Sequence, residues 1–174
     1  MSRLLVGLLL AAPVLPGQAI VTKDAYLPRD LVKVVRADLP DYLGDDCPDL
    51  ADSIRTTWLR LNSAGWSVVI QGIRHCFAGA NNGSYFVYTH TENGWRKILD
   101  ASGNRVYRLS TKTNEWQDLT VRQHSSAFES IRMIYKYDGN TYRATACLEV
   151  DEAEGGPPRP RIKDCSFDWR SADP

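Results

Sequence analysis

Residues 84–99 read Ser-Tyr-Phe-Val-Tyr-Thr-His-Thr-Glu-Asn-Gly-Trp-Arg-Lys-Ile-Leu, and this stretch decides the fold class. Two runs rich in aromatic and β-branched residues, which favour strands, flank the dipeptide Asn93-Gly94. An Asn-Gly pair in that setting predicts a type I′ hairpin turn, because that turn needs positive φ at both central residues. The same signal returns at Asp138-Gly139, between Ile-Tyr-Lys-Tyr and Thr-Tyr-Arg-Ala. Hairpins close locally, so the sequence predicts antiparallel strands.

Eight segments share this strand-like composition and are bounded by Gly, Asn, Asp or Ser. No helical pattern interrupts them, so we expect them to follow one another as a meander. The predicted strands are 54–61, 66–73, 84–91, 95–100, 106–110, 116–123, 128–137 and 141–150.

One segment before the strands has the period of a helix. Between residues 27 and 43, apolar residues recur at intervals of three and four residues, at Leu31, Val34, Val35 and Leu39. Pro40 and Gly44 mark the end of this stripe. The sequence therefore predicts a mainly β (α+β) domain. In it, an N-terminal helix packs on a twisted antiparallel meander sheet of about six to eight strands, stabilised by disulfides.

The first 19 residues have the organisation of a cleavable secretory signal peptide. Arg3 supplies a positive charge, Leu4 to Leu15 form an apolar run, and Gly17 and Ala19 supply small residues at the cleavage site. The run is too short to cross a hydrocarbon core of ~30 Å as a helix. The alternatives are a buried N-terminal helix or a membrane anchor. We expect a periplasmic or secreted protein cleaved near Ala19.

The rest of the chain divides into a domain and a tail. Residues 20–150 are expected to form one helix-plus-sheet domain, and 151–174 a Gly/Pro-rich linker followed by a cysteine-containing tail. The 21 basic and 21 acidic residues are well mixed, which argues against nucleic acid as the main partner. No segment after the signal is apolar enough to cross a membrane. We expect a monomer that needs no cofactor.

Four cysteines follow the predicted signal peptide. In an oxidising compartment an even number predicts two disulfides, and three pairings remain open. The absence of a Cys-x-x-Cys motif favours a structural role over redox chemistry or zinc binding. We expect one bridge to tie the N-terminal segment or the tail to the sheet. The cysteines are Cys47, Cys76, Cys147 and Cys165.

Residues with catalytic chemistry form no recognised motif. The three histidines lack metal-ligand spacing, and Ser125-Ser126 lies in no Gly-x-Ser-x-Gly elbow. Carboxylates cluster at 45–49 and 151–154, in turn-like segments where solvated charge is the default. We therefore predict neither a catalytic nor a metal site. The alternative is a hydrolase of an envelope polymer, with carboxylates brought together by the fold.

Aromatic residues on the predicted strands are the best candidates for a binding surface. Interleaved with Arg and Lys, an exposed Tyr/Trp face suits a protein or polysaccharide partner in the cell envelope, whereas the alternative is ordinary cross-strand packing. The small polar loop 78–84 could enter a groove of a partner. The candidate binding residues are Trp95, Trp116, Tyr135, Tyr137, Asn81 and Asn82.

The stretch from Trp58 to Cys147 resembles single-module bacterial exported domains of the FG-GAP, or integrin-like, β-repeat type. The resemblance implies a β fold around a calcium loop. Asn62-Ser63-Ala64-Gly65, at the loop position, has no carboxylate, so we expect no calcium there. The stretches that carry the resemblance are 59–70, 83–88, 94–99, 113–119 and 135–142.

Export, small size, cysteines and an aromatic sheet together favour a non-enzymatic binding domain of the inhibitor, immunity or envelope-interaction kind. A hydrolase and a purely structural exported module are the alternatives.

Overall fold

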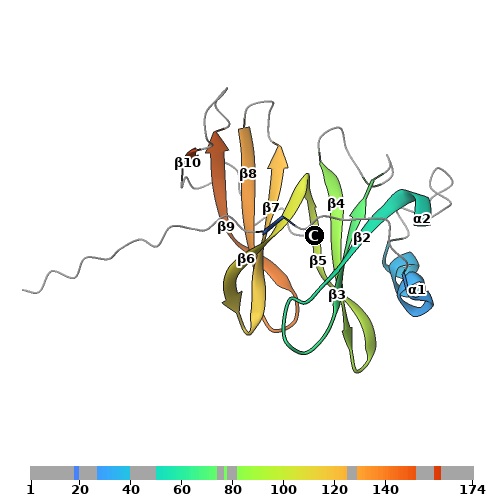
Figure 1. Cartoon of the computed structure of the whole chain (residues 1–174). Coiled ribbons are helices and arrows are strands. Elements are labelled where there is room, and N and C mark those ends of the chain that lie inside the picture. The colour runs from blue at the N-terminus through green and yellow to red at the C-terminus, as the bar shows by residue number, and fades with distance from the viewer. Residues whose placement is uncertain are drawn as a thin grey trace, which may run out of the picture.

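The computed structural model describes residues 18–19, 27–39, 50–73, 77, 82–124, 129–151 and 159–161 of the 174-residue chain. These residues form two antiparallel sheets and, beside one of them, a ten-residue helix (Figure 1). The prediction of a mainly β, antiparallel domain is therefore confirmed.

The first sheet has four strands in the order β2-β3-β4-β5. Each strand pairs with the next along the chain, so this part is a simple meander. The bounds are β2 (Ile54–Leu59), β3 (Ser67–Gly72), β4 (Gly83–Thr91) and β5 (Gly94–Gly103).

The second sheet is built on four long strands that also follow one another, with two short strands at its edges in the order β1-β6-β7-β8-β9-β10. All its pairs are antiparallel. The bounds are β1 (Gln18–Ala19), β6 (Arg105–Thr113), β7 (Trp116–His124), β8 (Glu129–Tyr137), β9 (Tyr142–Asp151) and β10 (Arg159–Arg161). All eight predicted strands are present, but the expectation of one continuous sheet was wrong.

The meander splits into two sheets at Gly103 and Asn104. β5 ends at Gly103 and β6 begins at Arg105, and the Asn104 N–H donates to the Arg122 carbonyl of β7 at 2.7 Å. A Cβ on Gly103 would lie 2.5 Å from Val121 Cγ1 and 2.6 Å from the Arg122 oxygen. Only a residue without a side chain lets the two sheets approach this closely, and the chain passes from the first sheet to the second at this glycine.

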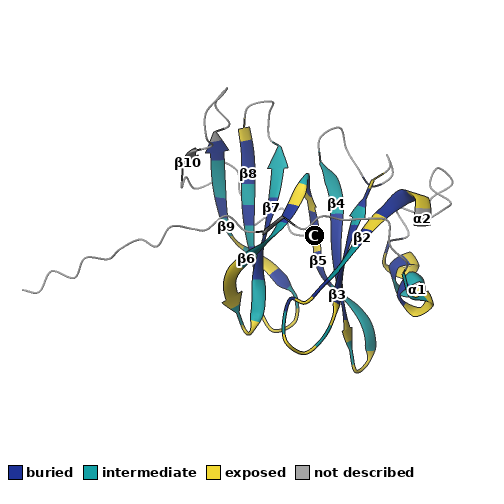
Figure 2. Cartoon of the chain, viewed as in Figure 1, coloured by how far each residue is buried: buried dark blue, intermediate teal, exposed yellow. Residues whose placement is uncertain are grey.

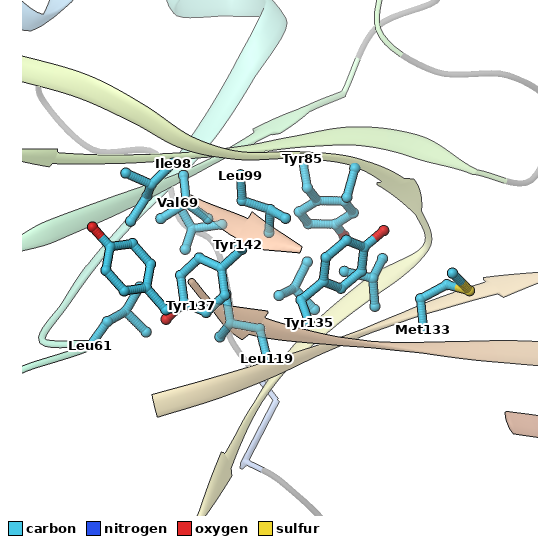
Figure 3. Close-up of a cluster of buried hydrophobic side chains, with 14 of the residues drawn as sticks. Leu61, Val69, Tyr85, Ile98, Leu99, Leu119, Met133, Tyr135, Tyr137 and Tyr142 are labelled. Atoms are coloured by element: carbon cyan, nitrogen blue, oxygen red, sulfur yellow. The ribbon is translucent and has the colours of Figure 1, made fainter. Parts of the chain in front are cut away.

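The main core lies between the two sheets (Figure 3). β7 contributes Leu119 and Val121 to it, and β8 contributes Met133, Tyr135 and Tyr137, which alternate with residues on the other face of that strand. Figure 2 shows buried residues along the middle of the strands and exposed ones at the hairpin ends.

A second core lies on the other side of the β2–β5 sheet, under α1 (Arg29–Asp38). Leu31, Val35 and Leu39 pack there against Phe86 and Tyr88 of β4. The apolar stripe in the sequence thus marks the buried face of the helix. The predicted range 27–43 was too long: α1 ends at Asp38, and residues 40–49 lie outside the described ranges. A one-turn helix, α2 (Leu50–Ser53), adds Leu50 to this layer.

Both predicted Gly-containing hairpins are present, but neither turn is type I′. Thr91 pairs with Gly94, and in that turn only Gly94 (φ 97°) has positive φ. This fits a turn closed by a glycine bulge. At the second hairpin the Asp138 side chain accepts hydrogen bonds from the Asn140 and Thr141 N–H groups, both at 2.8 Å, which organises a longer loop.

The pattern of positive φ that type I′ requires occurs instead between β6 and β7. Asn114 (φ 51°) and Glu115 (φ 65°) both lie in the left-handed region, and Thr113 pairs with Trp116 across them.

Parts of the predicted termini and cysteine framework lie outside the described residues. Of the predicted signal peptide, Gln18 and Ala19 are described, and they form β1 against Tyr107 and Arg108. Of the linker and tail, 151 and 159–161 are described. Cys147 is 6 % exposed and is not a free thiol. The other three cysteines lie outside the described ranges, so the two disulfides stay a prediction.

Within the described residues, no helix has the length and apolar character needed to span a bilayer.

Candidate functional site

The β6–β9 sheet has a second face, which points away from the main core, and we call it the outer face. Along β7, Leu119 and Val121 point into the core, so Thr120 and Arg122 between and beside them point outward. The same alternation on β8 places Arg132 outward, next to the inward Met133.

Three arginines form a row across the outer face. Arg105 of β6 is the register partner of Arg122 on β7, and Arg122 is the partner of Arg132 on β8. Directly opposite residues share a face, and neighbouring strands lie roughly 5 Å apart. The row therefore places three like charges side by side. Like charges directly opposite one another destabilise a sheet.

Several polar residues on the same face as this arginine row are buried. Asp118, Thr120 and Ser130 are 2 %, 6 % and 1 % exposed. Four buried atoms there have no hydrogen-bond partner: Asp118 Oδ1, Thr120 Oγ1, Ser130 Oγ and Arg132 Nε. Leaving a buried polar group unsatisfied costs roughly 1–3 kcal/mol. This concentration of unmet donors and acceptors therefore points to a ligand or partner.

Asn82, one of the predicted binding residues, lies at one end of the outer face. Its Nδ2 donates to the His124 carbonyl at 3.2 Å, and its Oδ1 accepts from the His124 N–H at 3.1 Å. His124 is the register partner of Ser130. The amide thus joins the start of β4 to the end of β7 and fixes the edge of the site. Asn81 lies outside the described residues.

Two predicted aromatic residues come together at the hairpin end of the main core. Trp116 stacks on Tyr137 with ring centroids 4.2 Å apart, and the Tyr137 hydroxyl accepts a hydrogen bond from Arg96 at 3.1 Å. Tyr137 and Tyr135 are 4 % and 8 % exposed. These two tyrosines therefore pack in the interior, which is the alternative that the sequence left open for the aromatics.

Trp95 lies apart from that group, on the helix side of the β2–β5 sheet. Its indole packs edge-on against Trp58, with 5.6 Å between ring centroids, and its Nε1 donates to the Asp30 carboxylate at 2.9 Å. The structure thus places it as a contact between β5 and α1.

Burial raises the pKa of two tyrosines in the main core. It raises the pKa of Tyr85 to about 12, and the hydroxyl donates to the Asn104 carbonyl at 3.0 Å. Burial also raises the pKa of Tyr142, whose hydroxyl donates to the Gln117 carbonyl at 2.6 Å. Both side chains therefore act as neutral donors that fasten one strand to another.

The arginine row was missed by the sequence reasoning. The alternation in 116–124 shows which residues of one strand share a face, but only the register brings Arg105, Arg122 and Arg132 together. The sequence did indicate that each arginine points away from the core, since each one is adjacent to a buried Val or Met of its own strand.

No group of three His, Cys, Asp or Glu side chains suited to a metal ion occurs in the part of the chain that is described. At the loop that resembles a calcium site, Asn62 Oδ1 accepts from the Ala64 and Gly65 N–H groups, at 3.1 and 3.3 Å. Comparison with models of known families, with curated proteins and with solved structures finds no match for this chain.

Proposed function

We propose that this chain is an exported, non-enzymatic binding domain that holds an acidic protein segment on the outer face of its β6–β9 sheet. The observation that carries the proposal is the group of buried polar atoms without partners on Asp118, Thr120, Ser130 and Arg132. They lie on the face that also carries the in-register row Arg105–Arg122–Arg132. Export is supported by the signal-like organisation of residues 1–19.

The chemistry of the face favours a peptide over a uniform polyanion. Guanidinium groups bind carboxylates through paired hydrogen bonds, so the row suits Asp or Glu side chains. Asp118, however, would repel a partner that is negative throughout, and its buried Oδ1 needs a donor. A peptide supplies carboxylates for the arginines and backbone N–H groups for Asp118, and its carbonyls can accept from Ser130.

The test is direct binding of a synthetic peptide of alternating glutamate and glycine to the full chain, exported from its own leader. We expect saturable binding that weakens as salt is raised. Arg132→Gln should weaken it about tenfold or more, because a charge-assisted hydrogen bond contributes roughly 1.5–3 kcal/mol. Arg55→Gln is the matched control, since Arg55 is an exposed arginine of β2, in the other sheet.

Equal affinity in the Arg132 and Arg55 variants would overturn the proposal, as would absence of binding at saturating peptide. Binding of polygalacturonate but not of the peptide would assign the face to an acidic polysaccharide and also contradict it. An alternating lysine–glycine peptide should not bind.

A further inference from the structure

We propose that Asn93 is a site of spontaneous modification, at which the side-chain amide becomes a carboxylate, and that the fold protects the other Asn-Gly pair of the chain from the same reaction. Asn93 lies between β4 and β5, in the first sheet. The site is therefore separate from the outer face of the β6–β9 sheet, on which the proposed function depends.

The reaction needs an asparagine whose successor leaves the backbone nitrogen accessible, and glycine does so because it has no side chain. The Gly94 nitrogen, once deprotonated, forms a bond to Asn93 Cγ while the bond from Cγ to Nδ2 breaks, so that ammonia leaves and a cyclic succinimide remains. Water then adds to either ring carbonyl. Opening the ring at Cγ gives aspartate, and opening it at the main-chain carbonyl gives isoaspartate. In total, water is consumed and ammonia is released.

The sequence contains two Asn-Gly pairs, Asn82-Gly83 and Asn93-Gly94, so each is a control for the other. Asn93 is exposed. Its backbone N–H donates to Thr91 Oγ1 at 3.2 Å, but its side-chain amide makes no hydrogen bond to any residue that the structure describes. The amide is therefore free to turn toward the Gly94 nitrogen.

The amide of Asn82, in contrast, is held at both ends. Its Nδ2 donates to the His124 carbonyl at 3.2 Å, and its Oδ1 accepts from the His124 N–H at 3.1 Å. Gly83 is the first residue of β4 and pairs with Gly103, so the backbone after Asn82 has the extended form of a strand. Ring closure would require the amide to leave His124 and the backbone to rotate out of the strand. We therefore expect Asn82 to react slowly in the folded chain.

Asp138-Gly139 could form the same ring by loss of water, and its surroundings also oppose this. Hydrogen bonds from the N–H groups of Thr141 and Asn140, both at 2.8 Å, lower the pKa of the Asp138 carboxyl. An ionised carboxylate is a poorer electrophile than an amide. Of these three pairs, the one with an unrestrained side chain is Asn93-Gly94.

Isoaspartate at position 93 would also change the hairpin, because the main chain then passes through Cγ and gains a methylene group. The Thr91 hydroxyl accepts from the Asn93 N–H at 3.2 Å and donates to the Gly94 carbonyl at 2.8 Å, so both bonds depend on the present length of the turn. Trp95 follows directly, and its Nε1 donates to Asp30 of α1 at 2.9 Å. We expect isoaspartate to weaken this contact between β5 and α1.

The experiment keeps the full, oxidised chain in mildly alkaline buffer, both folded and in urea, and quantifies each Asn-Gly peptide by mass spectrometry. In the folded chain we expect Asn93 to deamidate about tenfold faster than Asn82 or more, because two hydrogen bonds have to break at Asn82. In urea the two rates should be similar. A methyltransferase that labels isoaspartyl carboxylates should mark position 93 of the folded chain. It should not mark this position in Asn93→Gln, since glutamine would have to form a larger, less favourable ring.

Equal rates at Asn82 and Asn93 in the folded chain would overturn the proposal, as would an intact Asn93 after the unfolded chain has reacted. The same rate ratio in urea would show that local sequence distinguishes the sites, and would also contradict it. The effect on the hairpin is measured against Asn93→Asp, which supplies the carboxylate without the extra methylene. The isoaspartyl protein should melt at a lower temperature than this variant, and equal melting temperatures would refute the effect on the turn.

Discussion

Gly103→Ala should destabilise the protein through the corner between the two sheets. The added Cβ would lie 2.5 Å from Val121 Cγ1 and 2.6 Å from the Arg122 carbonyl oxygen. The methyl group of Val121 could rotate, but the oxygen belongs to the backbone and already accepts the 2.7 Å hydrogen bond from Asn104. Relief therefore requires the sheets to separate. Overpacking of this kind costs roughly 1–3 kcal/mol, and we expect the upper half of that range.

The assay is thermal and urea unfolding of the oxidised chain, with Gly65→Ala as the matched control. Nothing lies within 4 Å of a Cβ at Gly65, so that variant should change stability by no more than about 1 kcal/mol. For a chain of this length, each kcal/mol shifts Tm by roughly 2–4 °C, so Gly103→Ala should melt roughly 5–10 °C lower. Equal melting temperatures for the two variants would refute the idea that this close approach sets the corner.

Two further predictions concern the β6–β7 turn and the buried tyrosines. Glu115→Gly should stabilise the protein by about 0.5–1 kcal/mol, measured by urea unfolding, because Glu115 has φ 65° and a left-handed conformation costs a residue with a side chain more than it costs glycine. The control is Glu92→Gly, at a turn position without positive φ, which should destabilise the protein instead. Burial raises the pKa of Tyr85 to about 12, so the unfolded chain loses the tyrosine proton at a lower pH than the folded chain does. The contribution of Tyr85 to stability is therefore complete below about pH 10 and is lost towards pH 12. A free energy of unfolding that stays constant over this interval would contradict the prediction.

Local chemistry was sufficient to predict the strands, because each one combines alternation or β-branched residues with a polar boundary. It was insufficient to predict how many sheets they form. A meander with an interruption and a meander without one have the same periodicity, and the difference lies in a single contact between Gly103 and β7. The predicted type of the second hairpin turn was wrong for a related reason. The Asp138 side chain accepts hydrogen bonds from two loop N–H groups, and a prediction from the Asp-Gly dipeptide alone does not take these bonds into account.

The candidate site was harder to predict because its residues are far apart in sequence. The aromatics drew attention as binding candidates, yet Tyr135 and Tyr137 pack in the interior. A large side chain on a strand can point to either face of the sheet, and the sequence alone does not show which residues point inward. Once Leu119, Val121 and Met133 are placed in the core, the outward positions follow by alternation, but bringing Arg122 opposite Arg132 still requires the pairing register.

The outer face gathers in one place a feature that the rest of the described chain shows at scattered positions (Tyr88, Arg96 and Asn104), and this is the strongest reason to assign it a function. In both cores apolar side chains meet one another, and the tyrosines Tyr85 and Tyr142 find carbonyl acceptors. On the outer face, like charges are opposed and four buried polar atoms lack partners. Neither feature helps an isolated domain to fold. Such a concentration on one face is expected where stability has been exchanged for binding, because a bound partner supplies the hydrogen bonds that the buried atoms of Asp118, Thr120, Ser130 and Arg132 lack.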